Sequence, residues 1–262
     1  MDLQLKDKTA LISGSNRGTG KVIAQTLAKE GASVIFHSNE EGAAEACAAE
    51  NPGSYAIWGD LTTDAGATQA LAQAKAVAGD IDILVNNYGT ASAGRWTSSS
   101  SEDWLDMYQK NVLSAARLIQ GVVPAMKTRG WGRIVQLGTI GSHQPNSIMP
   151  HYYAAKGALA TMGVSLTKEL SHTGITVNTV SPGYIQTAEL EAGFRKRAQK
   201  KGWGDNWADI LAKIVETEYP NPCGRIADMQ EVADLVAFIC SDKAGFINGQ
   251  NIRIDGGAVA YV

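Results

Sequence analysis

Two side chains near the middle of the chain have types and a spacing suited to proton transfer. Tyr152 and Lys156 lie four residues apart in the run His-Tyr-Tyr-Ala-Ala-Lys-Gly at 151–157. In a helix, side chains four residues apart emerge on the same face. The ammonium is expected to lower the pKa of the phenol from its usual value of about 10. We therefore predict that Tyr152 donates and accepts a proton, although this pair also occurs by chance in many helices.

A glycine-rich segment near the amino terminus is suited to hold a dinucleotide. The apolar run at 9–13 leads into Gly-Ser-Asn-Arg-Gly-Thr-Gly at 14–20, and an amphipathic helical pattern follows. A strand, a glycine turn and a helix amino terminus together offer backbone N–H groups to a pyrophosphate. The spacing is Gly-x-x-x-Gly-x-Gly instead of the commoner Gly-x-Gly-x-x-Gly.

The residues after the second predicted strand bear on which dinucleotide is bound. A carboxylate there would accept hydrogen bonds from the ribose hydroxyls and would select NAD. Ser38 and Asn39 occupy this position, and Arg17 in the glycine turn can reach the same region. This pattern favours NADP(H). NAD(H) stays possible because Glu40 and Glu41 are nearby and Arg17 could be a surface charge.

The strands and helices predicted between these motifs determine where the motifs lie in the fold. Short apolar runs predict strands at 9–13, 33–37, 55–59, 83–86, 133–137, 175–180 and 251–254, with helical patterns in between. Such alternation implies an α/β fold: a doubly wound, Rossmann-type parallel sheet with helices on both faces. We expect a single domain over 1–262. Ligands in this architecture bind beyond the carboxyl ends of the strands, where the polar and glycine clusters lie.

A long helix is predicted over 102–123. Its apolar stripe is expected to consist of Leu105, Tyr108, Val112, Ala116, Ile119 and Val123. Asn111 is a polar residue beside that stripe.

The segment 184–223 interrupts the alternation of strands and helices. An insert of this length at the carboxyl end of a strand is expected to form a lid over the substrate. Trp203 and Trp207 within it could line an apolar pocket or anchor the lid. The basic residues at 195–197 and 200–201 fit a solvated helix face, and an anionic substrate tail would also explain them.

Composition excludes several classes of protein. The 262 residues carry a formal net charge of −3, which argues against a nucleic-acid partner. No apolar run is long enough to span a bilayer, and no signal-peptide pattern is present. The cysteines Cys47, Cys223 and Cys240 form no metal-ligand spacing. We expect a cytoplasmic protein that binds neither membrane nor metal.

Taken together, these motifs resemble the short-chain dehydrogenase/reductase family nearly end to end. The resemblance rests on the glycine turn, Asp60, Asn86-Asn87-x-Gly89, Asn111, Tyr152-x-x-x-Lys156, Pro182-Gly183 with Thr187, and Asp255-Gly256-Gly257. It implies NAD(P)-dependent interconversion of a small alcohol and its carbonyl compound. It also implies a homotetramer, or a homodimer.

The resemblance implies a role for individual residues. Tyr152 would be the general acid in reduction and the base in oxidation, Lys156 would bind the nicotinamide ribose, and Asn111 would hold a relay water. The residues expected to contact the dinucleotide are Gly14, Asn16, Arg17, Gly18, Gly20, Ser38, Asn39, Asp60, Leu61, Asn87, Gly89, Tyr152, Lys156, Pro182, Gly183, Ile185 and Thr187.

The chain departs from the family pattern at two positions. Thr139 stands where the family usually has a serine, and its hydroxyl can still bind the substrate oxygen in a tighter pocket; Ser142 is the alternative. Tyr88 replaces the usual alanine and could narrow the cavity or pack beneath the sheet edge. The residues expected to border the substrate are Tyr88, Ser142, His143, Gln144, Asn146, Met149, Tyr184, Trp203 and Trp207.

Our leading hypothesis is a reductase of ketones, or dehydrogenase of secondary alcohols, that uses NADP(H). Within this class, an oxoacyl-thioester reductase competes with a dehydrogenase of a sugar, polyol or cyclic alcohol that uses NAD. A different class is a regulator that senses NADP(H) without catalysis, but such a protein does not need Tyr152, Lys156 and Asn111. A methyltransferase on a similar sheet would not need the tyrosine–lysine pair either.

Overall fold

Seven parallel strands form one sheet in the computed structural model, which describes residues 2–260. The strand order is β3-β2-β1-β4-β5-β6-β7. The strands are β1 Thr9–Ile12, β2 Ser33–Ser38, β3 Tyr55–Trp58, β4 Ile83–Asn86, β5 Gly132–Leu137, β6 Ile175–Pro182 and β7 Asn251–Ile254. The predicted doubly wound sheet is confirmed. Because the order reverses between β1 and β4, a crevice is expected at their carboxyl ends.

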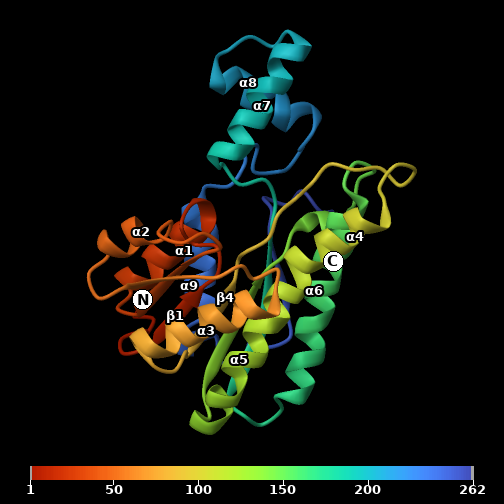
Figure 1. Ribbon diagram of the computed structural model, residues 1–262. Helices are drawn as coiled ribbons and strands as arrows, with labels where there is room; N and C mark the ends of the chain where they lie inside the picture. The colour runs from red at the N-terminus through yellow and green to blue at the C-terminus, as the bar shows by residue number, and fades with distance from the viewer. Residues whose placement is uncertain (1, 261–262) are drawn as a thin grey trace.

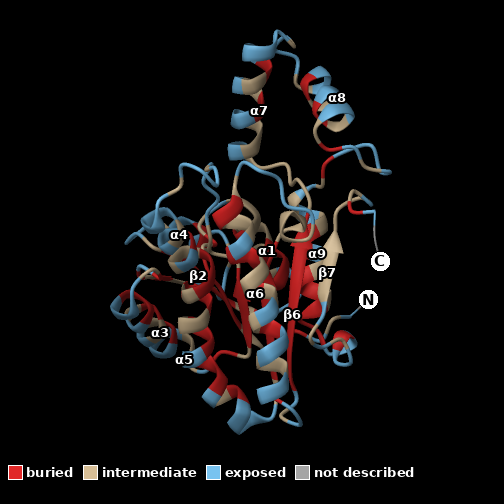
Figure 2. Cartoon of the chain, turned by 90° about the vertical axis from the view of Figure 1, so that its right-hand side faces the viewer, coloured by how far each residue is buried: buried red, intermediate tan, exposed pale blue. Residues whose placement is uncertain are grey.

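Helices cover both faces of the sheet (Figure 1). One face carries α1 (Gly18–Lys29) and α9 (Met229–Ile239), and the other carries α3 (Asp64–Ala78), α5 (Ser114–Arg129) and α6 (Pro150–Glu169). In β1, Ala10 and Ile12 belong to one buried cluster and Leu11 to the other. Successive side chains of a strand point to opposite faces, so strands that are apolar throughout belong to the middle of three layers, as the buried residues in Figure 2 show.

A π-helical segment interrupts the predicted long helix. Helix α4 (Ser101–Tyr108), the π segment (Gln109–Leu113) and α5 follow one another without a break. The predicted apolar stripe is wrong at its start, because Leu105 and Tyr108 are 65% and 43% exposed whereas Met107 is buried. A π turn contains one more residue than an α turn. The extra residue moves the inward-facing positions before it from 105 and 108 to 104 and 107, where Trp104 is half-buried and Met107 is buried.

Smaller helices complete the chain. Helix α2 (Glu45–Ala49) is only five residues long, too short to give a clear periodic pattern in the sequence. The 3₁₀ helices η2 (Ile140–Ser142) and η3 (Asp242–Ala244) follow β5 and α9. Among the described residues, no helix is both long and apolar enough to cross a membrane.

The segment predicted as a lid contains two helices that project beyond the carboxyl edge of the sheet (Figure 1). Helices α7 (Ala188–Lys201) and α8 (Trp207–Thr217) form this helical hairpin, residues 188–217. Phe194, Ala198, Ile210 and Ile214 make up its own small core, and Trp203 and Trp207 pack against that core. The tryptophans therefore anchor the hairpin, and neither of them lines the cavity described below.

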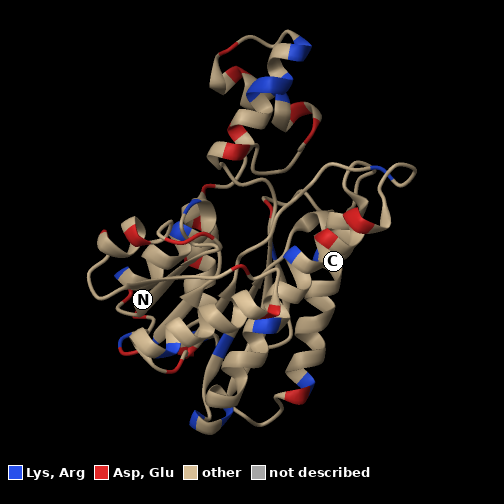
Figure 3. Ribbon diagram, viewed as in Figure 1, with Lys and Arg blue, Asp and Glu red and all other residues tan. Residues whose placement is uncertain are grey.

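Charges of both signs mix on the helical hairpin (Figure 3). Arg197 forms an ion pair with Glu218, and Lys201 Nζ lies 3.0 Å from the same carboxylate. Arg195 Nη2 lies 2.7 Å from Glu191 Oε1 on its own helix. Since three of the basic residues pair with neighbouring carboxylates, the structure favours a solvated helix face over a site for an anionic substrate tail.

Candidate active site

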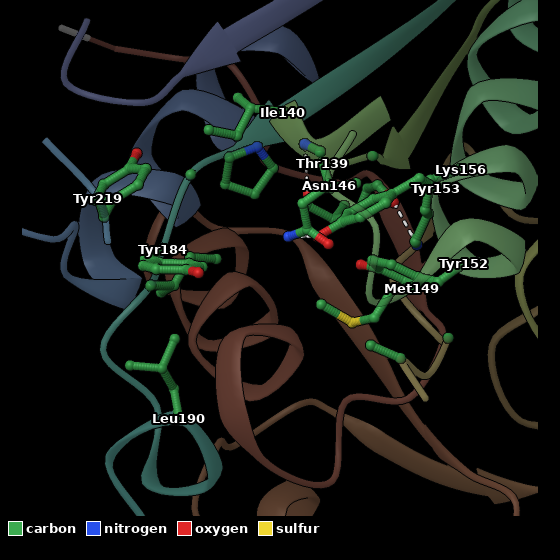
Figure 4. Close-up of a pocket in the computed structure, with 18 of the residues that line it drawn as sticks. Thr139, Ile140, Asn146, Met149, Tyr152, Tyr153, Lys156, Tyr184, Leu190 and Tyr219 are labelled. Atoms are coloured by element: carbon green, nitrogen blue, oxygen red, sulfur yellow. Dashed lines mark hydrogen bonds between the residues drawn. The ribbon is translucent and has the colours of Figure 1, made fainter. Parts of the chain in front are cut away.

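A cavity of about 810 Å³ lies beyond the carboxyl ends of β4, β5 and β6. Its lining comes from the loop after β4, the segment from β5 into α6, the loop after β6, and parts of the hairpin and its return. Thr19 at the start of α1 and Ala258 after β7 also line it. In Figure 4, Thr139, Tyr152 and Lys156 lie on one side and Tyr184, Leu190 and Tyr219 on the other. Ligand pockets of roughly 300–1,000 Å³ are typical, so the cavity can hold a substrate beside part of a cofactor.

The tyrosine and lysine lie on α6, as their spacing predicts. Pro150 occupies the first turn of that helix, where its missing N–H costs nothing. Lys156 is buried and its Nζ donates to the carbonyl oxygen of Leu137 at 2.7 Å. Burial lowers the pKa of Lys156 to about 8. A lysine held in this way stays in place but is easier to deprotonate than a solvated one.

The expectation that Lys156 lowers the pKa of Tyr152 is wrong for this structure. Burial, with a smaller contribution from Tyr153, raises the pKa of Tyr152 to about 12, and a hydrogen bond with Thr139 acts in the opposite direction. The ammonium of Lys156 is directed at the Leu137 carbonyl. Tyr152 is thus a protonated phenol at neutral pH, which suits a proton donor.

Thr139 and Ser142 are placed differently although only three residues separate them. Thr139 caps the short helix η2, accepts a hydrogen bond from Gly141 N at 3.2 Å and lines the cavity. Ser142 Oγ donates to the carbonyl oxygen of Thr139 at 2.8 Å and is not among the lining residues. Thr139 is therefore the hydroxyl beside Tyr152, whereas Ser142 does not line the cavity in this structure.

Asn111 lies in the π segment and has an unused acceptor. Its Nδ2 donates to the carbonyl oxygens of Thr90 and Met107, each at 3.0 Å. Its Oδ1 is buried and has no hydrogen-bond partner among residues 2–260. A Cβ built on Gly89 would lie 2.5 Å from this oxygen and 3.2 Å from Lys156 Nζ. Gly89 therefore leaves space between the two groups, and a buried acceptor of this kind is commonly satisfied by ordered water.

The glycine turn at the start of α1 has the shape that a pyrophosphate needs. Gly14 and Gly18 have φ values of +61° and +56°, and a Cβ on Gly18 would meet no atom within 4 Å. Gly20 is buried, and a Cβ there would lie 2.6 Å from Gly14 O. The amino terminus of α1 has no side-chain cap, so its N–H groups are available to an anion. Asn87 Nδ2 donates to the carbonyl oxygens of Ser13 and Gly14, each at 3.0 Å, and braces the turn.

At the adenosine end, some of the predicted residues lie at the surface and others are buried. Asn39 Nδ2 donates to Asp60 Oδ1 at 3.1 Å near the surface, and Arg17 Nε lies 3.7 Å from Glu189 Oε1 with both side chains exposed. Ser38 is buried and its Oγ accepts from Glu40 N. The side chain of Leu61 is fully buried in the core, so any contact of Leu61 with the dinucleotide would be made by its backbone. The carbonyl of Asn16 accepts from the Cys47 thiol.

At the opposite end of the cleft, Pro182, Gly183, Ile185 and Thr187 all line the cavity, as expected for a nicotinamide site. Thr187 also caps α7, since its Oγ1 accepts from Leu190 N at 3.2 Å. Gly183 is required by packing: a side chain there would collide with the hydroxyl of Tyr219. That hydroxyl donates to the Asp255 carbonyl at 2.7 Å.

The predicted substrate residues divide into two groups. Met149, Tyr184, Gln144 and Asn146 line the cavity. Tyr88 and His143 do not line it in this structure. The Tyr88 ring packs against the buried core, and His143 Nε2 lies 2.9 Å from Asn251 Nδ2.

Sequence reasoning missed two further aromatic residues of the cavity, Tyr153 and Tyr219. Tyr153 follows the predicted acid directly, and its hydroxyl accepts from Asn146 Nδ2 at 2.9 Å. Its ring lies over Gly141, where a Cβ would overlap it. The sequence offered one indication of this: a second aromatic residue directly after Tyr152, and a glycine, Gly141, in the preceding loop. No group of three or more potential metal ligands is present in residues 2–260.

Comparisons with known proteins agree with this geometry. Residues 14–259 match the family model described as Enoyl-(Acyl carrier protein) reductase. The chain is 34% identical to the 3-oxoacyl-[acyl-carrier-protein] reductase FabG of Escherichia coli (strain K12) over 97% of this chain and 98% of the relative.

Among solved structures, L-sorbose reductase of Gluconobacter frateurii, complexed with NADPH and L-sorbose, superposes with a TM-score of 0.94 at 30% identity over all of both chains. Gluconate 5-dehydrogenase of Burkholderia cenocepacia, in complex with NADP and tartrate, gives a TM-score of 0.87 at 28% identity over 100% of this chain and 98% of that one. With the glycine turn, the tyrosine–lysine pair and the seven-stranded sheet in place, the chain belongs to the short-chain dehydrogenase/reductase family.

Proposed function

We propose that this protein reduces the ketone of a small polyhydroxylated compound to a secondary alcohol with NADPH, and catalyses the reverse reaction with NADP. The observation that carries the proposal is the set of polar side chains that line the cavity around Tyr152. Amides of Gln144 and Asn146 and phenols of Tyr153 and Tyr184 line it, together with apolar residues such as Ile140 and Met149. Amides and phenols hydrogen-bond hydroxyl groups, and the apolar residues pack against the carbon skeleton of the substrate.

The positions of the chain's own groups support this proposal. When bound, the reduced nicotinamide would supply the hydride. Thr139 and Tyr152 would hold the ketone oxygen, and Tyr152, with a pKa near 12, would deliver its proton as negative charge develops there. Lys156 would hold the ribose of the dinucleotide, and the open acceptor of Asn111 would hold a water in a path that restores the proton.

The preference for NADP(H) rests on charges near the adenosine ribose. No carboxylate stands at the position of Ser38, and the exposed guanidinium of Arg17 is paired only at 3.7 Å with Glu189. A 2′-phosphate is a stronger partner for a guanidinium than an exposed carboxylate at this distance. The two solved structures described above contain NADPH or NADP.

A second candidate is a 3-oxoacyl-thioester reductase. The observation in its favour is the 34% identity to FabG across nearly the whole chain. The ion pairs that occupy Arg195, Arg197 and Lys201 weaken it, because they leave fewer free cations on the hairpin for an acidic carrier.

A substrate panel separates these candidates. The loss of NADPH absorbance would be followed with ketohexoses, keto-sugar acids, a simple cyclic ketone and a 3-oxoacyl thioester, each also with NADH. We expect the highest kcat/KM with a polyhydroxylated ketone and NADPH. Preference for the thioester would support the second candidate. Tight NADPH binding without turnover on any ketone would instead indicate a sensor.

We also propose a cytoplasmic homotetramer, or a homodimer, by analogy with the family. Leu105 and Tyr108 on α4 and Phe246 before β7 are exposed apolar side chains that a subunit contact would cover. Light scattering of the purified protein, coupled to gel filtration, measures the subunit number directly, and a monomer would refute this part of the proposal.

A further inference from the structure

A buried histidine joins the ends of three strands directly beneath the glycine turn. His37 lies near the end of β2 and is 1% exposed. Its Nδ1 accepts a hydrogen bond from the backbone N–H of Gly14 at 3.1 Å. Its Nε2 lies 3.0 Å from the carbonyl oxygen of Gly59. Because β2 lies between β1 and β3, the imidazole links the loops that leave all three strands.

Only one form of the ring can make both contacts. A backbone N–H can only donate, so Nδ1 must carry a lone pair. A carbonyl oxygen can only accept, so Nε2 must carry the proton. The ring is therefore neutral, with the hydrogen on Nε2. A proton added at Nδ1 would face the Gly14 N–H and remove that hydrogen bond.

The same residue holds the turn through its backbone. Ser15 N donates to the His37 carbonyl and His37 N donates to Ser15 Oγ, each at 2.9 Å. Ser15 Oγ in turn donates to Ile12 O at 2.7 Å. Gly14 has a positive φ, and a Cβ added to it would lie 3.1 Å from the Cα of Tyr88. The first residues of the turn are therefore fixed by His37 on one side and by the loop after β4 on the other.

We propose that His37 is a positioning residue for dinucleotide binding: its neutral imidazole holds Gly14, and with it the glycine turn, in the conformation that receives the phosphates. Without the ring, the N–H of Gly14 and the carbonyl of Gly59 would be buried without partners. Buried polar groups without partners are unfavourable, so the turn would be expected to rearrange. The inference rests on the proposed function only in requiring that a dinucleotide binds.

Charged groups around the ring are engaged elsewhere. Asp60, after Gly59, accepts from Asn39 and Thr62. The Cys47 thiol on α2 donates to the Asn16 carbonyl, and Arg17 pairs with Glu189. On the helices beside the turn and β3, Lys21 pairs with Glu50 and Asp64 with Arg117. Burial lowers the pKa of His37 to about 4, with the Gly59 carbonyl acting in the opposite direction. The imidazole of His37 is therefore unprotonated at and around pH 7.

Three substitutions separate the two hydrogen bonds. In His37→Asn, Oδ1 can replace Nδ1 as the acceptor for Gly14. In His37→Gln, Nε2 can replace the donor to Gly59 but no acceptor faces Gly14. His37→Leu keeps neither. The dissociation constant of NADPH would be measured by fluorescence on each full-length variant, together with the exchange rate of the Gly14 amide proton and the KM and kcat.

We expect His37→Gln and His37→Leu to raise the dissociation constant and the KM for NADPH at least about tenfold with little change in kcat. His37→Asn should stay within about threefold of the wild type and keep Gly14 protected from exchange. Equal affinity in all variants would overturn the inference, as would an Asn variant as weak as Gln, which would indicate core packing alone. If the wild type binds no dinucleotide, the proposed function fails first.

Discussion

The wall that carries Tyr152 and the helical hairpin opposite it are built in contrasting ways. Thr139 and Lys156 are attached to the end of β5 and to α6, and Lys156 is buried and hydrogen-bonded to Leu137. The helical hairpin has only its own four-residue core and a charged surface. The groups to which we assign chemistry are therefore held by the main core, whereas the part of the cavity wall that the hairpin contributes depends on a small, separate core. Substitutions in the first region should change turnover, and those in the second should change binding.

The largest effect is expected from Tyr152→Phe, which removes the proposed proton donor and keeps the ring. Loss of a general acid typically lowers the rate about 10²–10⁴-fold, and NADPH affinity should not change. Ketone reduction with excess NADPH, together with NADPH titration, tests this. Retained turnover would place the acid elsewhere and break the division between the two regions.

Thr139→Ala should lower kcat about 100-fold, because its hydroxyl is next to Tyr152 in the cavity. Ser142→Ala is the matched control, since Ser142 Oγ bonds the Thr139 carbonyl and does not line the cavity. The control should lose less than about threefold. If Ser142→Ala is the more damaging change, the loop after β5 rearranges when substrate binds.

The pH dependence of ketone reduction should report Lys156. Its pKa is lowered to about 8 whereas that of Tyr152 is raised to about 12. Below about pH 8 both groups carry the proton that reduction needs. Above it Lys156 becomes neutral first, so kcat/KM should fall about tenfold per pH unit. A profile measured from about pH 6 to about pH 10 that is flat would contradict the pKa of the buried lysine.

The smallest effect on chemistry is expected from Phe194→Ala in the core of the hairpin. It removes a buried aromatic ring, which costs about 3–5 kcal/mol where the surrounding structure cannot collapse. Because the hairpin has a separate core, we expect faster amide exchange at 188–217, a KM for the ketone raised several-fold and little change in Tm.

Leu118→Ala is the control for Phe194→Ala, because Leu118 lies in the main core under the sheet. This change should lower the Tm of the whole chain and leave the KM nearly unchanged. An equal loss of Tm in the two variants would show that the hairpin and the sheet unfold together, and the contrast drawn above would not hold.

The sheet could be predicted because every strand is a short, apolar run between glycine or polar turns. The tyrosine–lysine pair follows from helical spacing, and Thr139 from its distance along the chain. Tertiary packing decided the rest. The pKa of Tyr152 depends on where the Lys156 ammonium points, and the place of Trp203 depends on a hairpin core that has no periodic signal across its two helices. His37 looks like an ordinary strand residue until its two neighbours in space are known.

The π segment at 109–113 determines which way Asn111 faces. A π turn accommodates a single inserted residue within an otherwise regular helix. Deleting one residue there should restore continuous α-helical geometry, rotate α4 about its axis relative to α5, and withdraw the Asn111 amide from Gly89. The variant should be at least as helical as its parent and yet inactive. The irregular backbone thus directs the Asn111 amide toward Gly89, whereas a regular α-helix would direct it elsewhere.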